Sequence, residues 1–183
     1  RKNMKLVFAA LVATALAFTM PHEIVSKFIT SDPAKPTLPD TWSAAMDFDP
    51  PQPSLSDMYY CVDYPNSLMA MNMTTSGMDI HMVDDLAANV QYTMYAYFGQ
   101  WYCQKDDADT DVIPQDLFDD AVFVETDDDG DHWTVTMEGT TVDIWTDPAT
   151  GYMTKIGAPG QTILFSDFTE SPPTGTFWIM DGC

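Results

Sequence analysis

Short runs of alternating apolar and polar residues, separated by turn residues, limit the possible folds of this chain more than any other feature. A period of two is typical of a β-strand with one buried face. Asp128-Asp129-Gly130 is a strong hairpin signal because these residue types accept positive φ angles, and Pro-Asn and Asp-Pro steps mark further turns. The predicted strands are residues 42–48, 58–64, 67–73, 78–83, 90–97, 100–104, 121–125, 132–137, 141–146, 152–156, 162–168 and 176–180.

The alternation also predicts which side chains share a face. Leu68, Ala70 and Asn72 should lie on one face of their strand, and the intervening methionines on the other. In the second half, Trp133 and Val135 alternate with polar residues in the same way. One short helix is expected over residues 114–120, where Pro114 suits a first helical turn. The expected fold class is therefore all-β with one short helix: a curved antiparallel meander that forms a half-barrel, an open barrel or a sandwich.

The amino-terminal residues have the pattern of an export signal. Lys5 precedes an apolar run over residues 6–16, and Ala15-Leu16-Ala17 fits the small-x-small rule for cleavage. The prediction is a signal peptide over residues 1–17, a mobile arm and proline-rich linker over 18–40, and a β domain over 41–183. The alternative is an uncut membrane anchor. A cleaved leader implies a secreted, extracellular protein with no membrane span in its mature form.

The charge of the chain is strongly one-sided. It has 7 Lys and Arg residues against 28 Asp and Glu residues, a formal net charge of -21. Contact with phosphates requires cationic side chains, so the composition argues against nucleic acid and anionic lipid headgroups as partners. It favours cations and basic partners, or solubility in a salty medium.

Three cysteines are expected to meet oxidising conditions after export. Cys61 and Cys103 both lie within predicted strands, and we predict a disulfide between them that closes a loop of about 40 residues. Cys183 would then be unpaired, and either remains a free thiol or links two chains as a dimer.

Two stretches resemble a known family. Residues 58–64, followed by Leu68-Met69-Ala70-Met71, resemble the strand-turn-strand of ependymin-related proteins. Residues 141–156 resemble the "strand, Asp, turn, Gly, strand" hairpin of the ependymins and of the bacterial LolA and LppX lipoprotein carriers. The resemblance implies a curved antiparallel half-barrel that holds a hydrophobic ligand outside the cytoplasm and, for ependymins, calcium-dependent contacts.

Thirteen methionines and many aromatic residues are available to line a ligand cavity. Methionine adapts to irregular apolar ligands because its side chain is flexible and polarizable. An ordinary core filled by methionine is the alternative. The predicted ligand-binding residues are Met69, Met71, Met73, Met82, Tyr92, Met94, Trp101, Trp133 and Trp145.

An acidic run between two predicted strands suggests a cation site. Asp127, Asp129 and Asp131 are the candidate ligands, because calcium prefers clusters of carboxylate oxygens. The alternative is a solvated hairpin tip, since the glutamate that closes an EF-hand loop is missing. No other cofactor is expected.

Catalysis has little support in the sequence. No G-x-S-x-G motif is present, and nothing singles out a pair among the 28 acids. The expected function is that of a secreted acidic β protein that binds a hydrophobic small molecule or lipid in a sheet-lined cavity. The alternative is an extracellular structural or adhesion protein, with or without calcium bridges.

Overall fold

A computed structural model describes residues 32–108, 112–137, 139–158 and 160–183. The compact unit runs from Ala34 to Cys183, so it begins within the predicted linker. The predicted signal peptide and residues 18–31 of the predicted arm lie outside the described residues. The eleven strands are β1 (Thr41–Asp49), β2 (Leu55–Asp63), β3 (Leu68–Thr75), β4 (Met78–Asp85), β5 (Val90–Tyr97), β6 (Gln100–Asp106), β7 (Val122–Asp127), β8 (Gly130–Met137), β9 (Thr140–Thr146), β10 (Met153–Ala158) and β11 (Gln161–Thr169).

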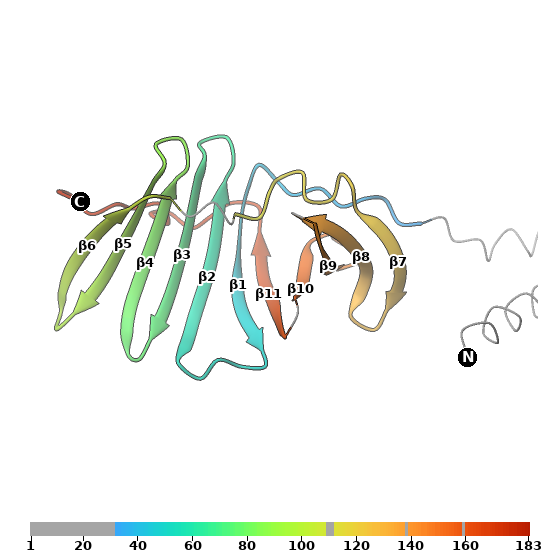
Figure 1. Ribbon diagram of the computed structural model, residues 1–183, viewed down its shortest axis with the longest axis horizontal. Coiled ribbons are helices and arrows are strands. Elements are labelled where there is room, and N and C mark those ends of the chain that lie inside the picture. Colours follow the sequence, from blue (N-terminus) through green and yellow to red (C-terminus); the bar gives the residue numbers. More distant parts are fainter. Residues whose placement is uncertain (1–31, 109–111, 138, 159) are drawn as a thin grey trace, which may run out of the picture. The chain divides into compact units, whose positions relative to one another are not determined.

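All eleven strands form one antiparallel sheet (Figure 1). Its order is β6-β5-β4-β3-β2-β1-β11-β10-β9-β8-β7, so two meanders, β1 to β6 and β7 to β11, join where β1 pairs with β11. The sheet is open, with β6 and β7 as its two edges. The all-β antiparallel prediction is confirmed, and eleven of the twelve predicted strands are present.

Two predicted elements are wrong. Residues 115–120 form turns in place of the expected helix, held by i→i+3 bonds such as Asp119 N–H to Asp116 C=O at 2.9 Å. A segment of seven residues that begins with a proline offers too few i→i+4 bonds to offset the cost of helix nucleation. The predicted last strand over residues 176–180 is also absent: residues 174–177 form a turn, in which Thr176 N–H bonds to Pro173 C=O, and residues 178–180 belong to no strand.

The hairpin between β7 and β8 shows how turn chemistry sets the register. Asp127 pairs with Gly130 across a two-residue turn, as the Asp-Asp-Gly signal predicted, and Gly130 has a φ of 127°. A Cβ atom at Gly130 would collide with the carbonyl oxygen of Thr146 on β9. Position 130 therefore requires glycine, because any other residue would have a strained backbone and a Cβ atom that clashes with β9.

Gly130→Ala is expected to lower the free energy of unfolding by about 1–3 kcal/mol, because it adds backbone strain and a backbone clash. Chemical denaturation of the variant measures this loss. Gly77→Ala is the matched control, since Gly77 also has a positive φ but no atom within 4 Å of its Cβ position. Equal losses in the two variants would show that the clash contributes nothing.

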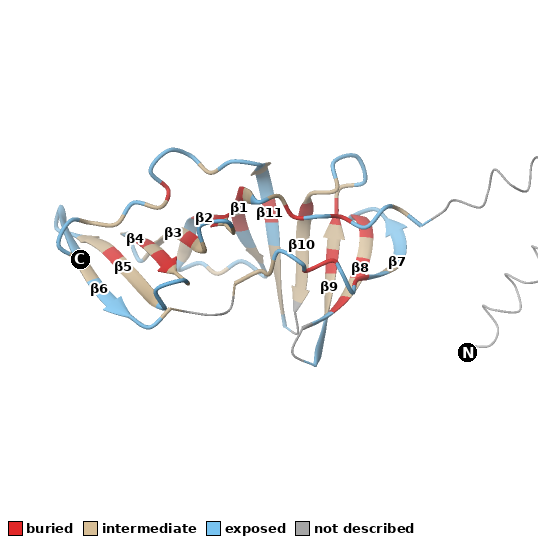
Figure 2. Ribbon diagram, turned by 90° about the horizontal axis from the view of Figure 1, so that it is seen from above, coloured by how far each residue is buried: buried red, intermediate tan, exposed pale blue. Residues whose placement is uncertain are grey.

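One face of the sheet carries the main core. Trp42, Tyr60, Trp133 and Ile144, from both meanders, belong to one buried cluster on this face, the core face. Figure 2 shows buried positions in strands of both meanders. The crossing segment, residues 112–121, precedes β7 in the connection between the two opposite edges of the sheet. Its Leu117 and Phe118 are 4% and 2% exposed and lie in the same cluster. The predicted apolar contact of these two residues is confirmed, although the helix is not.

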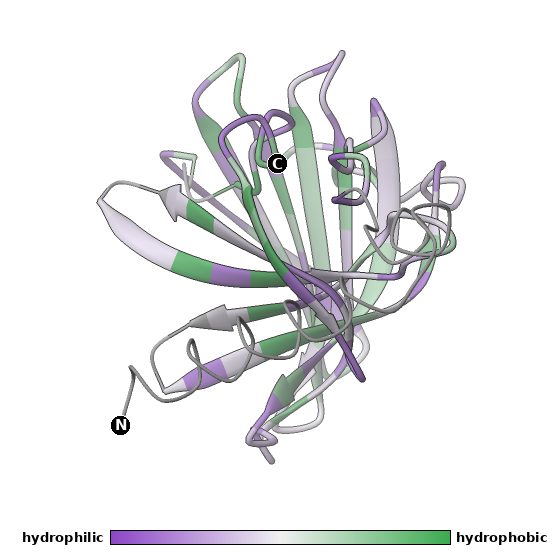
Figure 3. Ribbon diagram, turned by 90° about the vertical axis from the view of Figure 1, so that its right-hand side faces the viewer, coloured by the Kyte–Doolittle hydropathy of each residue, from purple (hydrophilic) through white to green (hydrophobic). Residues whose placement is uncertain are grey.

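The opposite face carries a smaller cluster of Cys61, Ala70, Val83 and Met94. Residues 170–183, the C-terminal segment, lead from β11 at the centre of the sheet toward β6 at its edge. Phe177, Ile179 and Met180 of this segment pack on the cluster. Figure 3 shows that hydrophobic bands lie within the strands of the sheet, while many turns are hydrophilic.

A disulfide fixes the end of the C-terminal segment. Cys183 is bonded to Cys103 on β6, with 5.7 Å between the Cα atoms, and Cys61 is a buried free thiol. The predicted Cys61–Cys103 bond is wrong, because β3, β4 and β5 separate the two strands. Four strand spacings amount to about 19 Å, far more than a disulfide spans. Since Cys183 is used within the chain, its sulfur is not available for the predicted link to a second chain.

Candidate functional site

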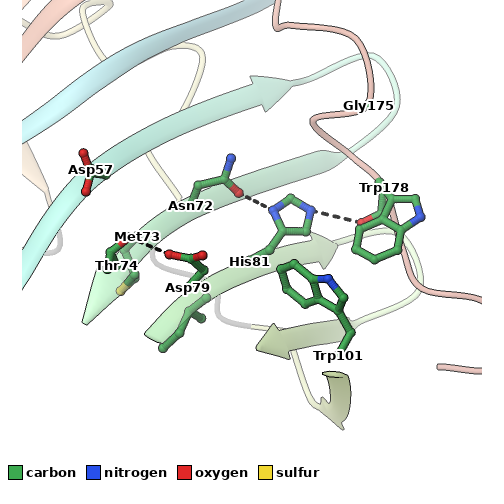
Figure 4. Close-up of a pocket in the computed structure, with 10 residues that line it drawn as sticks. Asp57, Asn72, Met73, Thr74, Asp79, His81, Trp101, Gly175 and Trp178 are labelled. Atoms are coloured by element: carbon green, nitrogen blue, oxygen red, sulfur yellow. Dashed lines mark hydrogen bonds between the residues drawn. The ribbon is translucent and has the colours of Figure 1, made fainter. Parts of the chain in front are cut away.

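A cleft of about 310 Å³ opens on the face that the C-terminal segment covers (Figure 4). Strands β3, β4 and β6 supply most of its wall, and β2 and the C-terminal segment supply the remainder. The volume is at the lower end of the range typical of small-molecule sites. The lining residues are Asp57, Asn72, Met73, Thr74, Asp79, Ile80, His81, Trp101, Gly175 and Trp178.

The β3–β4 hairpin sets the polar part of the wall. Its two-residue turn places Asn72 opposite His81 and Thr74 opposite Asp79. Cross-strand partners share a face, so all four side chains lie on the cleft side of the sheet. The Thr74 hydroxyl donates to Asp79 Oδ1 at 2.9 Å, and a ring nitrogen of His81 lies against the Asn72 amide.

His81 joins the sheet to the C-terminal segment. Its Nε2 lies 3.0 Å from the carbonyl oxygen of Trp178. A carbonyl can only accept, so Nε2 carries the proton in this contact. Burial lowers the pKa of His81, although the bond to the Trp178 carbonyl acts in the opposite direction. His81 is 9% exposed, and its burial therefore disfavours the charged form.

Acidification is expected to destabilise the fold around His81, because burial disfavours the charged imidazolium. A His residue whose pKa is lower in the folded state contributes stability above its unfolded pKa of about 6.5 and loses it as the pH falls toward the folded pKa. The free energy of unfolding should therefore drop between pH 7.5 and 5.5, as measured by urea denaturation. His81→Gln, which retains a donor but cannot titrate, should show a smaller drop. Identical pH dependence in both proteins would contradict this role of His81.

Two half-exposed indoles form the aromatic part of the cleft. Trp101 on β6 and Trp178 on the C-terminal segment are each 44% exposed, and their rings meet edge to face at 5.8 Å. The His81 ring stacks against Trp178 at 6.1 Å. Exposed tryptophans are costly to leave in water, and paired indoles are typical of binding surfaces.

A bulge in β2 brings an acid to the rim of the cleft. The register between β2 and β3 shifts between Ser56 and Tyr59, and Asp57 has a φ of 50°. Bulges of this kind redirect a side chain next to a site. Among the described residues that line the cleft, none is Lys or Arg, so its charge comes from Asp57 and Asp79.

The free thiol of Cys61 is not a candidate nucleophile for the cleft. Burial raises the pKa of Cys61 to about 12, and a hydrogen bond from Thr176 lowers it only in part. A thiol with so high a pKa is not a nucleophile at neutral pH.

The nine predicted ligand-binding residues are divided between the two faces of the sheet. Met69, Met71, Met73, Met82 and Trp133 point toward the core face by their strand register, whereas Tyr92, Met94, Trp101 and Trp145 point to the opposite face. Met69, Met94 and Trp133 are buried in the two clusters. Only Met73 and Trp101 line the cleft.

The predicted calcium ligands do not converge on one point. Asp127 accepts a bond from the Trp145 indole at 3.1 Å, Asp129 lies 2.6 Å from the Lys155 ammonium, and Asp131 accepts from Thr126. The indole bond lowers the pKa of Asp127. The group whose ligand atoms do lie within 4.8 Å of one another is Glu125, Asp127 and His132. Calcium binding at this hairpin stays a prediction.

Most of the cleft could not be seen in the sequence. Asn72, His81, Thr74 and Asp79 could have been grouped from the Ser76-Gly77 turn, because a two-residue turn fixes which residues are opposite. Trp178 gives no such signal, since it belongs to a segment without strand pairing. Its position depends on packing and on the Cys103–Cys183 bond.

No protein-family model matches this chain, and no curated protein matches it. Within the described part of the chain, no helix has the length and apolar character needed to span a membrane.

Proposed function

We propose that this chain is a secreted binding protein that holds a small molecule with an apolar body in the cleft between its sheet and its C-terminal segment. The Trp101–Trp178 pair carries the proposal. Two large apolar rings stay half exposed there at the mouth of a cavity, on a chain whose formal charge is -21. Burial of such apolar surface against a ligand is favourable by roughly 25 cal/mol per Å².

The way the cleft is built also supports binding. Its walls are tied together by the His81–Trp178 bond and by the disulfide at the end of the C-terminal segment. A cleft held open by such links costs little ordering free energy when a ligand enters. In this proposal the open sheet acts as a curved half-barrel, as the resemblance to ependymin and LolA proteins implies. The disulfide agrees with an oxidising compartment.

The ligand predicted from the sequence was a hydrophobic molecule or lipid enclosed by methionines. The ligand proposed here also has a hydrophobic body, but it binds in the cleft and not among the core methionines. Met69 and Trp133 are part of a filled core that Leu117 and Phe118 complete, whereas the apolar surface of the cleft comes from the indoles of Trp101 and Trp178.

Nile red fluorescence tests the proposal. The dye should bind with enhanced, blue-shifted emission, and Trp101→Ala or Trp178→Ala should weaken its affinity about tenfold, the effect of one lost aromatic contact. Phe98→Ala is the matched control, because Phe98 is a 91% exposed aromatic residue at the β5–β6 turn that does not line the cleft. Equal affinity in all four proteins would place the dye elsewhere and contradict the proposal.

A further inference from the structure

We infer that the ligand of the cleft carries a cationic head, of the alkylammonium class, on its apolar body. The inference rests on the proposed function and adds the charge of the ligand. It follows from the combination of aromatic rings and carboxylates in one cavity, with no cationic side chain among the described lining residues.

The two acids of the cleft lie on either side of its polar wall. Asp57 projects from the bulge of β2, and Asp79 lies on β4; both residues are exposed. Asp79 accepts a bond from Thr74, which fixes the position of its carboxyl group. Figure 4 shows both acids in the wall that also carries His81, and the indoles of Trp101 and Trp178 at its other end.

The aromatic rings favour the same kind of ligand. The face of an indole attracts an ammonium group, and pairs of aromatic rings near carboxylates recognise quaternary ammonium ions. The two indoles meet edge to face at 5.8 Å and each is 44% exposed, so a methylated ammonium in the cleft can reach the exposed part of an indole. The described lining adds no ammonium or guanidinium group to compete.

An anionic or uncharged head fits less well. A carboxylate placed near Asp57 and Asp79 would be repelled, and no described lining residue offers it a cation. A neutral hydroxyl could bond to Asn72 or Asp79 but would gain nothing from the ring faces.

Three eight-carbon probes separate the alternatives: octyltrimethylammonium, octanol and octanoate, compared by titration calorimetry below their aggregation concentrations. Octyltrimethylammonium should bind about tenfold more tightly than octanol, and octanoate should bind least. Added salt should weaken the binding of the cation and leave octanol nearly unchanged.

The variants Asp57→Asn and Asp79→Asn should each weaken the binding of octyltrimethylammonium several-fold and leave octanol unaffected. Asparagine accepts the positive φ of position 57, so both variants should fold. Asp128→Asn, at the exposed tip of the β7–β8 hairpin, changes the net charge equally and should have no effect. It therefore separates a local contact from the attraction of the whole acidic surface.

The outcomes distinguish the two proposals. If octanol or octanoate binds as tightly as the cation, or if Asp128→Asn weakens binding as much as Asp79→Asn, the inference is overturned and the binding function stands. If none of the three probes binds and Nile red binding is insensitive to Trp101 and Trp178, the proposed function itself fails.

Discussion

Replacement of Trp42 by alanine is expected to lower the free energy of unfolding by about 3–5 kcal/mol, the usual cost of deleting a fully buried large aromatic side chain. Trp42 is 0% exposed and lies on β1, where the two meanders meet. Its ring contacts Tyr60 at 5.4 Å and stacks on Phe168 at 5.1 Å, so one side chain holds β2 and β11 against β1. Few relaxed arrangements could fill so large a gap.

Denaturation in urea, followed by circular dichroism, measures this loss. Trp178→Ala serves as the control, because Trp178 is half exposed and its loss should cost about 1 kcal/mol or less. A similar small cost for Trp42→Ala would mean that the junction of the meanders is not the centre of the core.

Loss of the disulfide has the second large expected effect. Cys183→Ser should lower the free energy of unfolding by about 2–5 kcal/mol, because the bond joins residues 80 positions apart and restricts the unfolded chain. The C-terminal segment should also loosen, since only non-covalent contacts, among them the bonds of His81 and Met94, would then hold it. Emission from Trp178 should shift to longer wavelength.

Cys61→Ala is the control for this prediction. It removes a buried sulfur but leaves the disulfide intact, and it should cost about 1 kcal/mol. Peptide mapping of the unreduced protein should recover Cys103 linked to Cys183. A peptide that links Cys61 to Cys103, or equal losses in the two variants, would contradict the pairing.

The strands could be predicted because their signals are local. Alternation in residues 67–73 and the Asp128-Asp129-Gly130 turn each depend on neighbours along the chain, and both predictions are confirmed. The same apolar alternation misled the prediction at residues 176–180. There Phe177 and Ile179 pack across the sheet face, and the segment joins no strand.

The long-range features could not be predicted in the same way. The pairing of β1 with β11 depends on how two meanders meet, and the course of residues 112–121 depends on that order. The predicted Cys61–Cys103 bond was wrong because the two cysteines lie too far apart in the sheet. The predicted hairpins from β2 to β6 already implied that three strands separate them. The cleft depends on the C-terminal segment, so Trp178 had no signal in the sequence that would pair it with Trp101.

The most direct measurement of the central claim is an NMR titration of the five indole N–H signals with octyltrimethylammonium. The cleft predicts that the signals of Trp101 and Trp178 shift together and saturate, while those of the buried Trp42 and Trp133 and of the distant Trp145 stay in place. Shifts at Trp42 or Trp133, or no shift at any indole, would contradict a binding site between the sheet and the C-terminal segment.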